Sequence, residues 1–138
     1  MIKNWLALCF VAILLWSTGV ESKRVALVVG NANYEKTGSL SNPTNDVLTI
    51  AQSAKKAGFD DVVVARDLRM QDFQMKLREF RQKATGADLA MVYYAGHGVE
   101  SRGKNWLIPI DAKLQSSLDL PYEAINLERI LEALEGSS

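Results

Sequence analysis

The chain has 138 residues, of which 48% are hydrophobic and 23% are charged. This composition is typical of one globular domain, and the length is too short for two. Sixteen basic residues balance sixteen acidic residues, so the formal net charge is zero. A chain without net charge has no overall field that attracts polyanions. We therefore expect no nucleic-acid partner and no electrostatic binding to a membrane surface.

The N-terminus has the pattern of a secretory signal peptide. Lys3 supplies a positive charge, and an unbroken apolar run follows over residues 5–16. This run is shorter than the roughly twenty residues of a membrane-spanning helix, which favours a cleaved signal over residues 1–22. An uncleaved anchor over residues 5–20 is the alternative. In both cases we expect the domain at residues 23–138 to be exported, to a periplasm or out of the cell.

Cys9 is the only cysteine in the sequence, and it lies inside this apolar run. A domain cleaved after the signal therefore has no thiol for a disulfide bond or a thiolate metal site. The single histidine would need carboxylates to complete a transition-metal site. Gly30 is not followed by a glycine-rich nucleotide-binding pattern. We expect no metal and no other cofactor.

The first predicted elements after the signal are a strand and a helix. Residues 24–30 form a nearly continuous apolar run that ends in glycine, the pattern of a parallel strand buried on both faces. Residues 31–41 are rich in Asn, Gly and Ser and are predicted to be a loop. Asn42 then supplies an N-cap and Pro43 the first helical residue, and the apolar spacing predicts a helix over residues 44–57.

The alternation of strand and helix continues through the middle of the chain. Residues 59–65 contain three consecutive valines, which favour a second strand. Apolar residues recur every three or four positions from residue 70 to 84, which predicts a helix with a solvated charged face. Residues 88–95 predict a third buried strand. This order of elements predicts an open, mostly parallel α/β sheet flanked by helices.

The last third of the chain predicts a small hairpin and a final helix. Two short β-prone segments flank turn-like residues 101–104, and Pro109 fits an edge strand. Asn126 is placed to cap a helix over residues 127–134.

His97 directly follows the third predicted strand, between Gly96 and Gly98. In open α/β sheets, ligands bind beyond the carboxyl ends of the strands, where this histidine and the loop at residues 31–46 both lie. Histidine exchanges protons near neutral pH, so it can act as a general acid or base. The glycines let a substrate backbone approach and leave the Gly98 N–H free to point at it. The alternative is a histidine that only ends a strand in a glycine-rich turn.

Four segments, in order along the chain, resemble the landmarks of caspase-like and metacaspase-type cysteine peptidases: residues 25–34, 40–47, 93–99 and 105–112. The resemblance implies a caspase-like fold, of which this chain would carry the first three core strands and a small hairpin. It also implies a His–Cys dyad that cleaves peptide bonds, with His97 as the dyad histidine and Gly98 as an oxyanion-hole donor. A peptide or protein substrate is the implied partner.

Asp46 matches a carboxylate that lines the primary substrate pocket of metacaspases, which implies a preference for Arg or Lys before the scissile bond. Leu40 stands where true caspases carry an arginine for aspartate recognition, and this difference also favours the metacaspase-like preference. The alternative for Asp46 is a carboxylate in the first turn of a helix, where the helix dipole stabilises it.

No cysteine follows His97 in the sequence. In caspases the nucleophile lies about 50 residues after the histidine, a position beyond residue 138 of this sequence. We therefore expect residues 23–138 to be a partial catalytic domain that is inactive alone. The second hypothesis is a non-catalytic caspase homologue that binds a peptide or partner protein. The free edge of the third strand, where the cysteine-bearing strand would pair, predicts marginal stability or self-association.

Overall fold

The computed structural model describes residues 22–137. The predicted signal peptide or anchor lies almost wholly outside these residues, as does Cys9. The strands are β1 (Arg24–Gly30), β2 (Asn33–Tyr34), β3 (Gly38–Ser39), β4 (Asp61–Arg66), β5 (Leu89–Ala95), β6 (Gly98–Ser101), β7 (Lys104–Leu107) and β8 (Ile125–Asn126). The helices are α1 (Asn42–Lys56), α2 (Met70–Ala84), α3 (Leu120–Glu123) and α4 (Leu127–Leu134). Within the described part of the chain, no helix is long and apolar enough to cross a membrane.

The central sheet is parallel, with the strand order β4-β1-β5. Gly30 at the end of β1 lies opposite Arg66 of β4 and Ala95 of β5, so all three strands end at the same edge. The predicted parallel α/β sheet is therefore confirmed. The loops that follow these strands are brought together at this edge.

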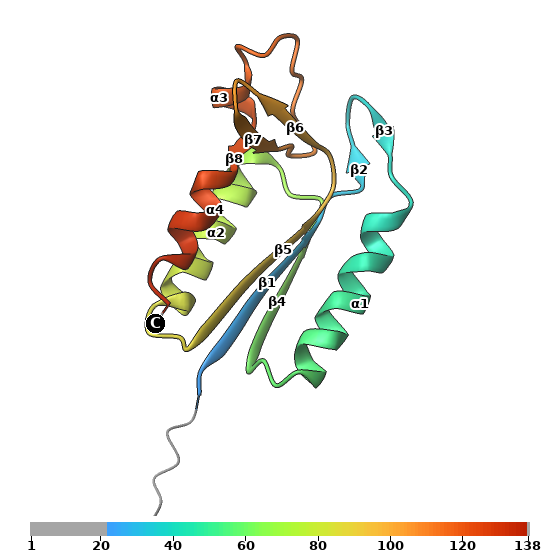
Figure 1. Cartoon of the computed structure of the whole chain (residues 1–138). Coiled ribbons are helices and arrows are strands. Elements are labelled where there is room, and N and C mark those ends of the chain that lie inside the picture. Colours follow the sequence, from blue (N-terminus) through green and yellow to red (C-terminus); the bar gives the residue numbers. More distant parts are fainter. Residues whose placement is uncertain (1–21, 138) are drawn as a thin grey trace, which may run out of the picture.

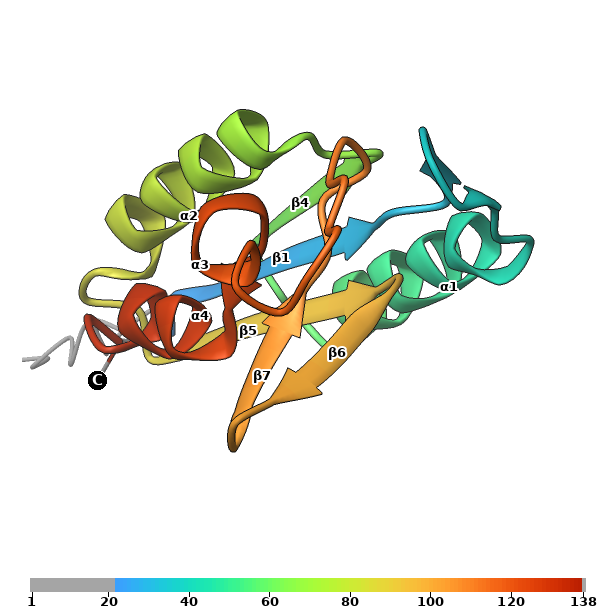
Figure 2. The same cartoon turned by 90° about the horizontal axis from the view of Figure 1, so that it is seen from above.

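The helices cover both faces of the sheet. The chain passes from β1 to β4 through α1, then returns across β1 to β5 through α2. Nearly all such crossovers are right-handed, so reversing the direction of travel moves the helix to the opposite face. Figures 1 and 2 show α1 on one face and α2 and α4 on the other.

The main core lies between the sheet and the α2–α4 layer. Alternate β1 residues Val25, Leu27 and Val29 belong to this core, because successive strand side chains point to opposite faces. From α2, Phe73 and Phe80 are 0% and 2% exposed, as the three- and four-residue spacing predicted. Truncating a buried phenylalanine of this kind to alanine costs about 3–5 kcal/mol.

Gly30 allows α1 to approach the end of β1. A Cβ atom at this position would lie 2.2 Å from Cγ2 of Val47 and 2.9 Å from the carbonyl oxygen of Pro43. Both neighbours are buried residues of α1. Glycine is required here for space rather than for an unusual backbone angle.

The structure corrects the prediction for the segment between β1 and α1. Ser41 occupies the N-cap position and Asn42 is already helical, so Asn42 is not the cap. Its place inside the helix is compatible with Pro43 at the next position, because the first helical N–H groups need no intrahelical acceptor. The predicted loop also contains the short antiparallel pair β2–β3, which is joined by a turn at residues 35–37; Gly38, the first residue of β3, has a φ of 84°.

The predicted hairpin is β6–β7, and β8 adds a third strand that the sequence pattern did not predict. Arg102 and Gly103 form the turn, with φ values of 53° and 74°. Positive φ at both central residues is typical of tight two-residue hairpin turns. Pro109 is fully buried beyond β7 rather than in an edge strand, so that prediction was wrong. The capped helix is confirmed, since Asn126 Oδ1 accepts the Glu128 N–H at 3.0 Å.

The position of β5 differs in part from the prediction of a buried strand. It lies at the edge of the sheet, paired only with β1 among the described strands. Residues 90–95 are half-buried, whereas β1 is buried almost throughout. An edge strand lacks a neighbour on one side, and its side chains are exposed there for that reason.

Candidate active site

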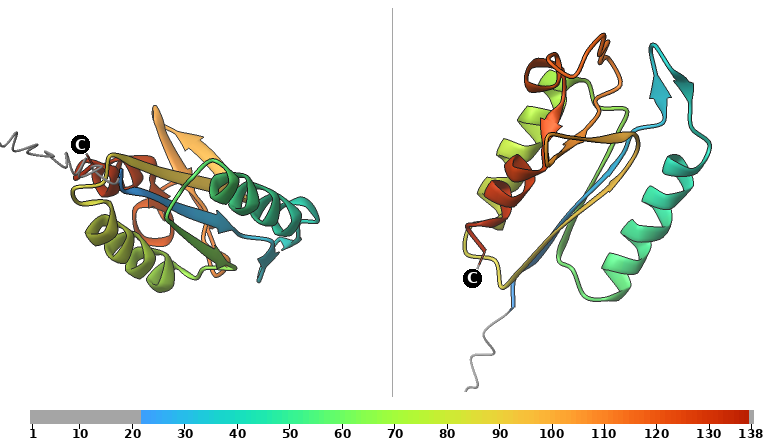
Figure 3. Two further views of the ribbon diagram at one scale, coloured as in Figure 1. Left: turned by 90° about the horizontal axis from the view of Figure 1, so that it is seen from below. Right: turned by 45° about the horizontal axis from the view of Figure 1, so that its top comes forward.

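His97 lies where the three parallel strands end, between β5 and β6. It is half-buried. The loop after β1 lies beside it, because Asn31 donates its N–H to the carbonyl of Ala95 at 2.8 Å. Figures 1 and 3 show the β2–β3 and β6–β7 hairpins beyond this same end of the sheet. The structure thus confirms that the histidine and the loop after β1 both lie at the carboxyl edge of the parallel sheet, the edge at which ligands bind in open α/β folds.

Two tyrosines hold the backbone of His97. The Tyr34 hydroxyl accepts the His97 N–H at 2.7 Å, and the Tyr94 hydroxyl lies 2.8 Å from the His97 carbonyl oxygen. The Tyr94 hydroxyl also lies 3.1 Å from the carbonyl oxygen of Ile108, and the two hydroxyls are 3.2 Å apart. Both polar groups of the His97 backbone are therefore bound by side chains from separate strands.

The Tyr34 ring also contacts the imidazole directly. The two ring centroids are 4.4 Å apart, with the planes tilted by 50°. Tyr34 is 7% exposed, so its ring forms a buried wall against which the histidine rests. This contact leaves the imidazole fewer orientations than a side chain in an open glycine-rich turn would have.

Both phenols remain protonated at neutral pH. Burial raises the pKa of Tyr34; hydrogen bonds from Tyr94 and from the His97 N–H lower it by less, and the charge of Asp67 adds to the rise. Burial raises the pKa of Tyr94 far above its ordinary value, and the hydrogen bond and charge of Tyr34 raise it further. The hydrogen bond at the Ile108 backbone lowers this pKa by a smaller amount. The tyrosine pair therefore serves as neutral hydrogen-bonding groups.

Gly96 lets the tyrosine pair reach the His97 backbone. A Cβ atom at Gly96 would lie 2.5 Å from the Tyr94 hydroxyl and 2.6 Å from the Tyr34 hydroxyl. No real Cβ atom tolerates such contacts. At Gly98 the same addition would meet only the Trp106 carbonyl oxygen, at 3.4 Å, which is an ordinary contact. Gly98 is exposed and begins β6, opposite Leu107.

Asn31 joins the three loops under the site. Its side chain is fully buried and accepts the Leu68 N–H at 2.9 Å. Its amide nitrogen donates to the carbonyl oxygens of Ile108, at 3.2 Å, and Leu68, at 3.4 Å. The loop after β4, the loop after β1 and the segment after β7 are held together in this way. All polar atoms of the Asn31 side chain are satisfied, as buried amides require.

Asp67 supports the loop after β1 from the end of β4. Its carboxylate accepts the N–H groups of Ala32 and Asn33, both at 2.9 Å, and the Asn33 side-chain amide at 2.8 Å. Partial burial acts to raise the pKa of Asp67. The hydrogen bonds from Asn33 and Ala32 and the charge of Arg66 outweigh that effect, so the pKa lies below its ordinary value.

Asp46 reaches a small cavity beside the histidine. The cavity measures about 220 Å³ and is lined by Asp46, Gly96, Ala95 and the segment from Leu40 to Pro43. Asp46 is exposed and is the fifth residue of α1, and the first turn of that helix contains no acidic residue. The alternative role as a first-turn carboxylate is therefore not supported. The structure brings Asp46 and the residue before His97 into one cavity.

Sequence reasoning did not identify Asn31, Tyr34, Asp67 or Tyr94 as residues of the site. The signal for Asn31 and Asp67 was their position directly after two apolar strand runs, which places polar groups at the active edge of a parallel sheet. Nothing local in the sequence pairs the two tyrosines. Within residues 22–137, no group of three or more His, Cys, Asp or Glu side chains is placed to hold a metal ion.

Comparison with known proteins shows which family this chain belongs to. The human mucosa-associated lymphoid tissue lymphoma translocation protein 1 is 33% identical over 89 residues, which make up 64% of this chain and 11% of that protein. Its homolog from Mus musculus is 32% identical over 89 residues, again 11% of its length. A family model described as a caspase domain matches residues 23–138. Since this match spans the whole parallel sheet and the histidine at its edge, the chain belongs to the caspase domain family.

Proposed function

We propose that His97 is the acid–base residue of a cysteine peptidase, and that the cleft beside it binds the substrate peptide. The observation that carries this proposal is the anchored backbone of His97 beside the cavity that contains Asp46. A thiolate would attack the substrate carbonyl carbon and form a tetrahedral intermediate. As the C–N bond breaks, the imidazolium of His97 would give its proton to the leaving amine. Water would then hydrolyse the thioester and restore the thiol.

Gly98 is proposed to donate its N–H to the oxyanion of that intermediate. It follows His97 directly and is exposed, so a substrate oxygen has access to it. A second donor would come from the residue that carries the nucleophile.

The nucleophile is proposed to come from a further strand that pairs with β5. Cys9 is the only cysteine among the 138 residues, and no thiol follows His97. Leu89 of β5, an edge strand, is 46% exposed. An added strand would cover the open edge and bring its carboxyl end beside the end of β5.

Asp46 is proposed to select Arg or Lys before the scissile bond. Its carboxylate is the only charged group among the residues that line the 220 Å³ cavity. A guanidinium or ammonium group that enters this cavity would form a charge-assisted hydrogen bond with it. An acidic side chain in the same place would be repelled.

The coding sequence beyond residue 138 tests the enzyme proposal first. An in-frame Asp-x-Cys within roughly ten to fifteen codons would support it, since caspases place the cysteine about 50 residues after the histidine. A stop codon would instead support the second candidate, a non-catalytic homologue that binds a peptide or partner protein.

Peptide hydrolysis by the extended protein tests the residue roles. His97→Ala should abolish cleavage of Arg and Lys reporters, and Asp46→Asn should reduce it while leaving Asp reporters equally poor. Asp72→Asn, at an exposed carboxylate of α2, is the matched control. Activity that survives His97→Ala would refute the dyad role. An unchanged Arg and Lys preference in Asp46→Asn would refute the role of the pocket.

Two further proposals concern the export of the protein and its self-association. Export through residues 1–22 is tested by N-terminal sequencing of the mature protein, and an unprocessed N-terminus in a cytosolic fraction would contradict it. Self-association of the chain through β5 is tested by sedimentation velocity. If the chain is a monomer with a cooperative thermal transition, the free edge of β5 does not cause self-association or marginal stability.

A further inference from the structure

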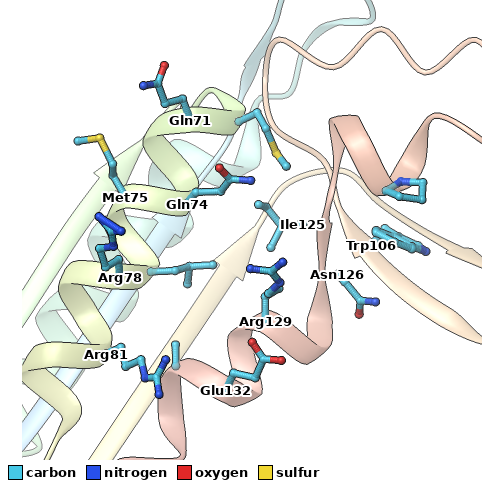
Figure 4. Close-up of a pocket in the computed structure, with 14 residues that line it drawn as sticks. Gln71, Gln74, Met75, Arg78, Arg81, Trp106, Ile125, Asn126, Arg129 and Glu132 are labelled. Carbon is cyan, nitrogen blue, oxygen red and sulfur yellow. The ribbon is translucent and has the colours of Figure 1, made fainter.

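A second cavity lies between α2 and α4, away from His97. Its volume is about 670 Å³, and of the residues named above at the active site only Trp106 lines it. Figure 4 shows side chains of both helices projecting into this space, with Trp106 and Asn126 at one end. The volume falls within the range of roughly 300–1,000 Å³ that is usual for ligand sites.

Three arginines line this groove without an ion-pair partner among the described residues. Arg78 and Arg81 come from α2, and Arg129 comes from α4. The other basic residues of α2 behave differently, because Lys76 pairs with Glu79 and Lys83 pairs with Asp61. The groove therefore carries three positive charges against the single negative charge of Glu132, although the whole chain has no net charge.

The rest of the groove suits a peptide rather than a densely charged ligand. Its inner wall includes Leu77, Ile125 and Ala133, which are 7%, 3% and 4% exposed. Gln74 contributes an amide that can bind a peptide main chain. Glu132 is the single acidic residue in the lining, and its carboxylate would repel closely spaced phosphates.

We propose that this groove binds an acidic segment of a partner protein. Carboxylates of the segment bind Arg78, Arg81 and Arg129, whose planar guanidinium groups suit paired hydrogen bonds to carboxylates. An apolar side chain of the segment packs on the wall at Leu77. The proposal does not rest on the proposed peptidase activity, since none of the three arginines lines the cavity that contains Asp46.

Fluorescence anisotropy of the whole chain with a labelled peptide of alternating Glu and Leu residues tests the proposal. We expect saturable binding that weakens at higher salt and is lost when Gln replaces each Glu in the peptide. The triple variant Arg78→Ala, Arg81→Ala, Arg129→Ala should weaken binding at least about tenfold, a loss of about 1.4 kcal/mol. The double variant Lys76→Ala, Lys83→Ala is the matched control and should bind within about twofold of the parent.

Glu132→Gln should change the affinity for the acidic peptide in the direction opposite to that of the arginine variants. Removing the one carboxylate in the groove should tighten binding of the acidic peptide. The three arginines and Glu132 are exposed, so circular dichroism should show the parent fold in these variants. No binding of the Glu peptide, equal binding of the Gln peptide, or unchanged affinity in the triple variant would overturn the proposal. Tighter binding of an oligonucleotide than of the peptide through the same arginines would overturn it as well.

Discussion

Replacing Tyr34 by phenylalanine removes one hydrogen bond to His97, together with the 3.2 Å contact between the two tyrosine hydroxyls. The change removes the hydroxyl that accepts the His97 N–H at 2.7 Å and keeps the ring that lies 4.4 Å from the imidazole. An N–H left without an acceptor costs about 1–3 kcal/mol when it is buried. His97 is half-buried, so water restores part of this loss, and we expect the free energy of unfolding to fall by about 1–2 kcal/mol. The midpoint of thermal unfolding should fall by roughly 3–8 °C.

Two measurements on the purified chain check this expectation. Urea unfolding gives the change in the free energy of unfolding. NMR follows His97 directly, because it is the only histidine and gives a single set of imidazole signals. Exchange of the His97 amide hydrogen should accelerate by more than the global loss of stability explains. The imidazole ring-proton shifts should change little in Tyr34→Phe and strongly in Tyr34→Leu, which also removes the aromatic ring.

Tyr122→Phe is the matched control, since that side chain is 80% exposed. It should change the free energy of unfolding by less than about 0.5 kcal/mol. If Tyr34→Phe leaves the protection of the His97 amide unchanged, the tyrosine hydroxyl does not hold the histidine backbone, and the reasoning is refuted.

Three other substitutions test the packing and charge around the site. Gly96→Ala forces a methyl group to within 2.5–2.6 Å of the two tyrosine hydroxyls, and urea unfolding should show a loss of about 1–3 kcal/mol, against a smaller loss for Gly98→Ala. Gly30→Ala should destabilise by a similar amount because of the 2.2 Å contact with Val47, and Val47→Ala in the same chain should recover part of that loss. Asp67 has a lowered pKa in the folded state, so its stabilisation is present above the unfolded pKa of about 3.9 and is lost as the pH falls through the folded value. Asp67→Asn should therefore lower stability at neutral pH and flatten its decline at acid pH.

Each of these has an outcome that would contradict it. Equal losses for the alanine variants at positions 96 and 98 would mean that the tyrosine hydroxyls move aside freely. Strictly additive effects of Gly30→Ala and Val47→Ala would show that the two side chains do not meet. An unchanged pH profile in Asp67→Asn would show that other carboxylates carry the acid dependence.

The periodic part of the fold could be predicted because it depends on local spacing. The apolar run of β1 and the three- and four-residue repeat of α2 predicted a buried strand and an amphipathic helix, and their bounds agree with the structure. The position of His97 at a strand end followed from the same patterns. Boundaries near caps were less certain, as the one-residue shift at Asn42 shows, because several polar residues in a row are chemically suitable caps.

The sequence by itself determined the three parallel strands, the helices between them and a histidine at their carboxyl edge. Only the tertiary structure decided what surrounds that histidine. Tyr34 and Tyr94 lie 60 positions apart, and they meet because the register of β1 and β5 aligns Gly30 with Ala95. The groove between α2 and α4 depends likewise on how two distant helices pack. Such contacts are set by strand order and register, which arise from the summed burial of the whole core rather than from the residues on either side.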